Sequence, residues 1–96
     1  MGTMATEIDA RLEYGAQGLG LMNETISGKF YPIDAIEKGG FIEDEWLGRP
    51  IRVERGAVDG VPFAVYLDGD GERPMQLLSR WYGFSFTFPN CEIYQP

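Results

Sequence analysis

The chain has 96 residues, a length typical of one domain, with 44% hydrophobic and 24% charged residues. Its formal net charge is −7, from fifteen acidic and eight basic residues. Such a charge disfavours nucleic acid and anionic membranes as partners, because binding either one relies on a basic surface. No apolar stretch approaches the ~20 residues of a membrane span. We therefore expect no nucleic-acid partner and no membrane partner.

We expect a single domain over residues 4–96. A second methionine at Met4 indicates that residues 1–3 are a cloning remnant, and the sequence leaves open whether residues 4–20 are ordered. The single cysteine, Cys91, rules out an intrachain disulfide and fits a reducing compartment, so we expect a cytoplasmic protein. Thirteen glycines and six prolines are typical of many turns and short strands.

The first elements in chain order are short and separated by glycines. Residues 6–14 alternate apolar and charged side chains, which predicts a half-buried strand, although a frayed helix also suits their composition. The next three glycines predict repeated breaks in the chain: Gly15, Gly18 and Gly20. A strand is expected at residues 21–26, turning at residues 27–28 into residues 29–31.

A short amphipathic helix is predicted over residues 32–38. Pro32 suits a helix start, where its missing N–H would be unpaired anyway, and Gly39-Gly40 ends the helix. At about two turns, such a helix needs tertiary packing to be stable.

The clearest β pattern is a hairpin of residues 51–54 and 61–67. Ile51 and Val53 alternate with charged residues, so we expect them to share one face. Pro62 indicates that the second strand begins at a sheet edge or a bulge. In that strand we assign one face to four apolar residues: Val61, Phe63, Val65 and Leu67.

The aromatic segment at residues 80–89 fits two patterns. A helical stripe would use Leu77, Leu78, Trp81, Tyr82 and Phe84, whereas a strand would alternate Phe84, Phe86 and Phe88 with Ser85 and Thr87. Gly83 weakens a helix by ~1 kcal/mol. Pro89 ends either element.

Three blocks of this sequence resemble an uncharacterised bacterial domain family of unknown function. They are residues 31–36, residues 40–44 with 48–53, and residues 81–84 closing on 88–94. The family shows a Tyr-Pro helix start, a Gly-Gly-x-Pro-Val strand and an aromatic helix ending in His-Pro-Asp-Thr-Glu. Its Cys-Pro-Leu-Cys-Gly centre is absent here, so no metal or redox chemistry is carried over. Phe88, Asn90 and Cys91 replace the His, Asp and Thr of the closing motif. The resemblance implies a helix at the aromatic segment and no function.

The fold predicted from these elements is α+β. We expect a small antiparallel sheet of about four strands, a short helix at 32–38 and a C-terminal aromatic helix at about 76–88, packed on the sheet.

The absence of histidine removes histidine-based triads and most zinc or iron sites, so catalysis would have to rely on other side chains such as carboxylates. The acidic residues at 43–45 beside Trp46 could supply a carboxylate with a raised pKa, but a solvated acidic turn is the preferred interpretation. Residues 68–72 resemble part of a calcium loop that lacks its terminal acid, so a hairpin turn is preferred. We predict no metal and no cofactor.

Other polar candidates also have simpler interpretations. Arg49, Arg52 and Arg55 could hold a phosphate or carboxylate, but pairing with nearby acids is preferred. Cys91 lies beside Glu92, which disfavours a thiolate, so a buried structural thiol is preferred to a nucleophile.

The aromatic segment is the main candidate for function. It could be core, an oligomer interface, or the wall of a ligand pocket in which Arg80 or Gln76 fixes the ligand. The candidate pocket or interface residues are Trp81, Tyr82, Phe84, Arg80 and Trp46.

Two functions follow from these candidates. The first is a non-enzymatic binding or assembly module, expected to be a homo-oligomer. The alternative is a small-molecule binder with an aromatic-lined pocket, or a small enzyme in which Glu43, Asp44 or Glu92 is the acid/base and Arg80 the anion clamp.

Overall fold

The computed structural model describes residues 11–13, 15–23 and 27–95. These residues form seven strands in two sheets, of order β6-β1-β2-β7 and β3-β4-β5, and two short helices. The predicted α+β class is confirmed at this level, whereas a sheet of about four strands is wrong. The elements are β1 (Gln17–Met22), β2 (Gly28–Pro32), α1 (Ile33–Gly39), β3 (Phe41–Trp46), β4 (Arg49–Arg55), β5 (Pro62–Tyr66), β6 (Gln76–Arg80), α2 (Trp81–Thr87) and β7 (Glu92–Ile93).

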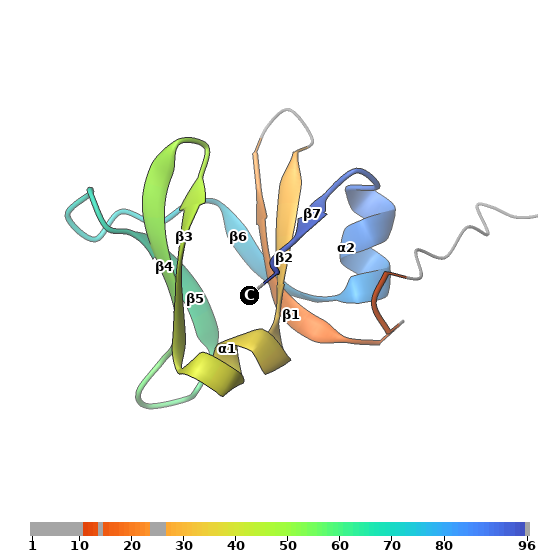
Figure 1. Cartoon of the computed structure of the whole chain (residues 1–96), viewed down its shortest axis with the longest axis horizontal. Helices are drawn as coiled ribbons and strands as arrows, with labels where there is room; N and C mark the ends of the chain where they lie inside the picture. Colours follow the sequence, from red (N-terminus) through yellow and green to blue (C-terminus); the bar gives the residue numbers. More distant parts are fainter. Residues whose placement is uncertain (1–10, 14, 24–26, 96) are drawn as a thin grey trace, which may run out of the picture.

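The two sheets face one another, and α2 covers the other face of the four-stranded sheet (Figure 1). Helix α1 lies across one end of both sheets, where it contacts strands from each. All neighbouring strands are antiparallel except β2 and β7. The chain therefore has two cores, one on each face of the four-stranded sheet.

The core between the sheets is apolar and continuous. Ile51 and Val53 of β4 are completely buried and share one face of that strand, as predicted. The buried members of this core are Leu19, Leu21, Tyr31, Ile36, Ile42, Trp46, Ile51, Val53, Ala64 and Tyr66. Burying side chains of this size contributes roughly 1.5–3 kcal/mol each.

The core beneath α2 explains the glycines of β1. A Cβ on Gly20 would overlap the ring of Phe84, and one on Gly18 would overlap the ring of Phe30. The prediction that Gly18 and Gly20 break the chain is therefore wrong. Both lie inside β1, and their missing side chains let the aromatic rings approach the sheet.

The two helices agree with the sequence to different extents. Helix α1 spans Ile33–Gly39, close to the predicted 32–38, with Pro32 as the residue that precedes it. Helix α2 begins only at Trp81, so the predicted helix start at about 76 is wrong. Residues 76–80 instead form β6 because they pair along the whole of β1. Long-range pairing has outweighed the local helical pattern.

The β4–β5 hairpin is confirmed, and β5 begins at Pro62 on the edge of its sheet. The predicted face of β5 is wrong, because the structure buries Pro62, Ala64 and Tyr66 rather than their neighbours. Both faces of this strand are apolar, so alternation does not distinguish them. Register decides the face: Ala64 lies opposite Val53, and Tyr66 opposite Ile51.

The first strands differ from the expected boundaries. Strand β1 spans Gln17–Met22 rather than 21–26, and it pairs with β2 at Gly28–Pro32. The predicted strand at 6–14 lies almost entirely outside the described residues. Within the described part of the chain, no helix is long and apolar enough to cross a membrane.

Candidate functional site

On the side where β2 faces β3, the gap between the sheets is closed by a polar cluster. Lys29 Nζ lies 2.6 Å from Asp44 Oδ2, and the Tyr31 hydroxyl donates to the same oxygen at 2.8 Å. Tyr94 stacks on Tyr31 with 5.5 Å between the ring centroids. A cation and a carboxylate from different sheets thus hold this side together.

The hydrogen bonds that Asp44 accepts from Lys29 and Tyr31 also affect its pKa. Partial burial alone would raise the pKa, but hydrogen bonds from Lys29, the backbone of Glu45 and Tyr31 outweigh it, so the pKa lies below its ordinary value. The suggested raised pKa at 43–45 is therefore wrong for Asp44. The preferred acidic turn is wrong too, because these residues belong to β3. Burial, and next the hydrogen bond to Asp44, raise the pKa of Tyr31.

On the opposite side, where β5 faces β6, the side chain of Gln76 joins the sheets. The Gln76 amide accepts from Ala64 N–H at 2.8 Å and donates to Ala64 C=O at 3.0 Å. It also donates to Pro74 C=O at 2.8 Å. Gln76 thereby satisfies both main-chain groups of Ala64, much as a paired strand would.

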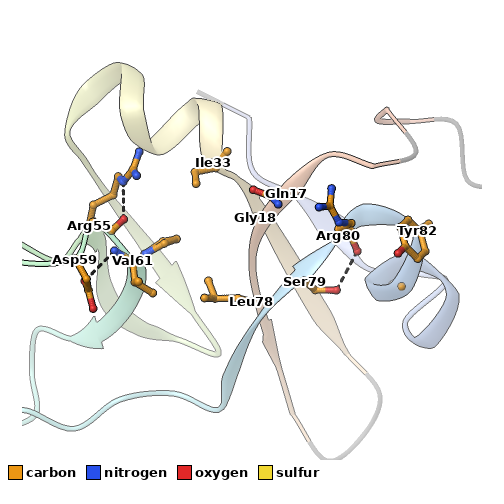
Figure 2. A pocket seen from close by; sticks show the side chains of 13 residues that line it. Gln17, Gly18, Ile33, Arg55, Asp59, Val61, Leu78, Ser79, Arg80 and Tyr82 are labelled. Carbon is orange, nitrogen blue, oxygen red and sulfur yellow. Dashed lines mark hydrogen bonds between the residues drawn. The ribbon is translucent and has the colours of Figure 1, made fainter.

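Beyond this bridge, a cleft of about 570 Å³ opens between the sheets. Figure 2 shows β5 and the turn before it on one wall and the end of β6 with α2 on the other. Leu78, Val61, Pro62 and Ile33 give the cleft an apolar floor, and polar groups surround them. We call this space the cleft; its lining is Gln17, Gly18, Ile33, Arg55, Asp59, Gly60, Val61, Pro62, Leu78, Ser79, Arg80, Tyr82 and Gly83.

Two arginines from different sheets contribute to the lining (Figure 2). Arg80, the exposed last residue of β6, donates to Gly15 C=O at 3.0 Å, and no acidic side chain among the described residues pairs with it. Arg55 Nε donates to Gly60 C=O at 2.7 Å. Asp59 accepts from Val61 N–H at 3.0 Å, which fixes the turn. Guanidinium groups carry permanent charge and bind carboxylates in a bidentate manner, so this lining suits anion binding.

The aromatic segment is divided between core and surface. Trp81, Phe84 and Phe88 are buried beneath α2, and Phe30 lies against both Trp81 and Phe84 with ring centroids 5.2 and 5.4 Å apart. Tyr82 is 44% exposed and lines the cleft beside Arg80. Of the candidate binding residues, the structure thus brings together Arg80 and Tyr82.

The other candidates lie elsewhere. Trp46 is buried between the sheets and borders, with Glu92, a second cavity of about 630 Å³. Glu43 is on the exposed face of β3, and Asp44 is held by Lys29. None of the three candidate acids lines the cleft that contains Arg80.

The remaining polar candidates are engaged in structure. The guanidinium of Arg49 lies 2.9 Å from both Asp68 and Glu72, which belong to the loop between β5 and β6. Hydrogen bonds to these acids raise the pKa of Arg49, and the bond from Arg49 lowers the pKa of Glu72. Arg52 lies 3.7 Å from Glu54. Among the described residues, no group of three or more acids and cysteines could hold a metal ion.

Cys91 is buried at 2% exposure. The guanidinium of Arg11 donates to its carbonyl at 2.9 Å and lies 3.7 Å from its sulfur. The sequence could not show that a basic side chain lies next to this thiol, because Arg11 and Cys91 are far apart in the chain.

Sequence reasoning missed Asp59, Val61 and Ile33 as cleft residues. They come from the turn before β5 and from α1, and only the packing of the two sheets brings them to β6. The sequence could not place these residues beside β6, because it predicted residues 76–80 as part of a helix.

No protein-family model matches the chain, and no characterised protein or solved structure was found to match it. The resemblance to the uncharacterised bacterial family therefore stays a prediction.

Proposed function

We propose that this protein is a non-enzymatic binding module, and that the cleft holds a ligand with an apolar segment and a carboxylate group. The observation that carries the proposal is the position of Arg80, a guanidinium with no acidic partner among the described residues, beside an apolar floor. Pockets of roughly 300–1,000 Å³ with a few convergent polar groups are typical of small ligands.

The charge distribution supports an anionic ligand in the cleft. The chain as a whole carries −7, so an anion is repelled by most of its surface. Among the described residues that line the cleft, Arg55 and Arg80 are basic and Asp59 is acidic. The carboxylates considered for catalysis are absent from that lining, which supports binding over acid–base chemistry.

The experiment is a thermal-unfolding series with straight-chain carboxylates from butanoate to octanoate. We expect the melting temperature to rise with chain length, because a longer tail buries more apolar surface, and to stay constant with the matching amides. The shift is expected to vanish in Arg80→Gln and to persist in Arg52→Gln. The second variant also removes one positive charge, but from outside the cleft, on the face of β4 opposite Ile51 and Val53. A shift of equal size in Arg80→Gln, or none with any carboxylate, would contradict the proposal.

A second candidate function, homo-oligomeric assembly, is favoured by one observation. Leu77 and Leu78 of the edge strand β6 expose 43% and 53% of their surface, and Met75, directly before this strand, exposes 58%. Exposed apolar edge strands are templates for pairing with another copy. Light scattering after size exclusion tests it: assembly predicts a mass above that of one chain that falls in Leu78→Lys, and a single-chain mass at all concentrations contradicts it.

A further inference from the structure

We propose that the natural occupant of the cleft is the extended carboxyl-terminal segment of another polypeptide, which adds as a strand to the outer edge of β6. This inference rests on the proposed function and names the class of its ligand. The main-chain N–H and C=O groups on the two strands that border the cleft support it, because they are occupied on β5 and open on β6.

The outer edge of β5 is closed to an added strand. Leu67 N–H donates to Pro50 C=O, so Leu67 is bonded to β4. In an antiparallel pair every second residue is bonded to the partner strand, so the main-chain groups of the even-numbered residues of β5 point away from β4. Ala64 gives both groups to the Gln76 amide. Tyr66 N–H donates to Glu72 C=O at 2.8 Å, and Pro62 has no N–H. Every outward N–H position of β5 is thus used or missing.

The outer edge of β6 is open. Trp81 N–H donates to Ala16 C=O and Met22 N–H to Met75 C=O, which fixes the odd-numbered residues as those bonded to β1. The main-chain groups of Leu78 and the N–H of Arg80 therefore point away from β1. No hydrogen bond within the described part of the chain takes them. They present an alternating donor and acceptor pattern that an extended peptide matches.

Side-chain subsites accompany this edge. A third cavity, of about 520 Å³, shares Val61, Pro62 and Leu78 with the cleft and continues along β6 toward Arg73. The Arg73 guanidinium lies 4.6 Å from the centre of the Phe63 ring, at the far end of this surface. Apolar side chains thus continue from the cleft along β6, with Arg80 and Arg73 toward opposite ends.

A peptide carboxylate suits the Arg80 end. Arg80 is extended, with φ −90° and ψ 154°, so its N–H continues the edge pattern while its side chain lines the cleft. A peptide that pairs with Leu78 would place its terminal carboxylate beside this guanidinium. Because extended peptides use main-chain bonds for affinity and alternate side chains for selectivity, the apolar floor would select an apolar residue.

The experiment is an NMR titration of the ¹⁵N-labelled chain with acetyl-Thr-Val-Thr-Val bearing a free carboxylate. We expect shift changes centred on β6 and slower exchange of the Leu78 amide. A matched peptide with N-methylated central residues is expected to bind about tenfold more weakly, because it loses main-chain hydrogen bonds and keeps its charge. A C-terminal amide is expected to weaken binding in the wild type and to make no difference in Arg80→Gln.

Each other outcome overturns this inference in a recognisable way. Equal binding of the N-methylated peptide would show that the main chain of β6 is not used. If simple carboxylates stabilise the chain but the peptide leaves Leu78 exchange unchanged, the inference fails while the proposed function stands. If neither binds, both fail. Leu78 protection that rises with protein concentration alone would assign the edge to a second copy of this chain.

Discussion

The two sides on which the sheets meet are closed by different means, and the difference locates the site. On the β2–β3 side, Lys29, Tyr31 and Asp44 join the sheets through a carboxylate that accepts two short hydrogen bonds. On the β5–β6 side, the Gln76 amide joins the sheets at one end and a cleft opens at the other. On the first side a carboxylate and an ammonium pair across the two sheets, whereas on the second side Arg80 lines the cleft without an acidic partner among the described residues.

The role of a candidate residue depends on the groups around it as well as on its residue type. Asp44 has the residue type of a general acid, yet its neighbours hold it ionised. Arg80 has the residue type of an ordinary surface charge, yet it lies over an apolar cleft without an acidic partner among the described residues. The variants below test each side in turn.

The largest effect is expected where a charge pair joins the sheets. Asp44→Ala removes the close partner of the largely buried Lys29 ammonium and leaves it only the exposed Glu92 carboxylate at 3.9 Å, which we expect to lower the free energy of unfolding by about 3 kcal/mol. Urea denaturation measures it. Glu43→Ala, on the exposed face of the same strand, is the control and should stay within about 0.5 kcal/mol of wild type. Equal effects of the two variants would show that the pair does not join the sheets.

The same pair predicts a pH dependence. The folded-state pKa of Asp44 lies below that of the unfolded chain, so its contribution is complete above the unfolded value and is lost as pH falls through the folded one. The stability difference between wild type and Asp44→Asn should therefore be constant above about pH 5 and shrink below about pH 4. A difference that grows on acidification would contradict the lowered pKa.

A smaller effect is expected at the other side. Gln76→Ala leaves both main-chain groups of Ala64 without their partner and should cost about 1–2 kcal/mol. Gln76→Glu keeps an acceptor for the Ala64 N–H but places a carboxylate against its C=O, so it should not restore wild-type stability. If Gln76→Ala unfolds at the wild-type urea concentration, the bridge does not hold β5 to β6.

The smallest effect on stability is expected for Arg80→Gln. Among the described residues, its guanidinium makes an exposed hydrogen bond to Gly15 C=O and no ion pair, so the free energy of unfolding should change by less than about 0.5 kcal/mol. Calorimetry on the ligand-free variant measures this. A loss as large as that of Gln76→Ala would mean that Arg80 supports the fold and would weaken its assignment to binding.

The sequence predicted elements whose pattern is local. Helix α1 and the β4–β5 hairpin follow from Pro32, from Gly39-Gly40 and from clear alternation at Ile51 and Val53. It failed where contacts between distant segments decide the secondary structure. Residues 76–80 have a helical pattern but pair with β1, and Gly20, predicted as a chain break, lies inside a strand where the Phe84 ring leaves no room for a side chain. The cleft was beyond sequence reasoning because its walls come from different sheets.

The edge of β6 is open where the edge of β5 is closed, and amide hydrogen exchange in the ligand-free chain reports this difference residue by residue. We expect fast exchange at Leu78, slow exchange at its neighbours Leu77 and Ser79, which pair with β1, and slow exchange at Ala64 on β5. Adding acetyl-Thr-Val-Thr-Val should slow exchange at Leu78 alone among these four. A Leu78 amide already as protected as Leu77 in the dilute, ligand-free chain would show that the β6 edge is not open.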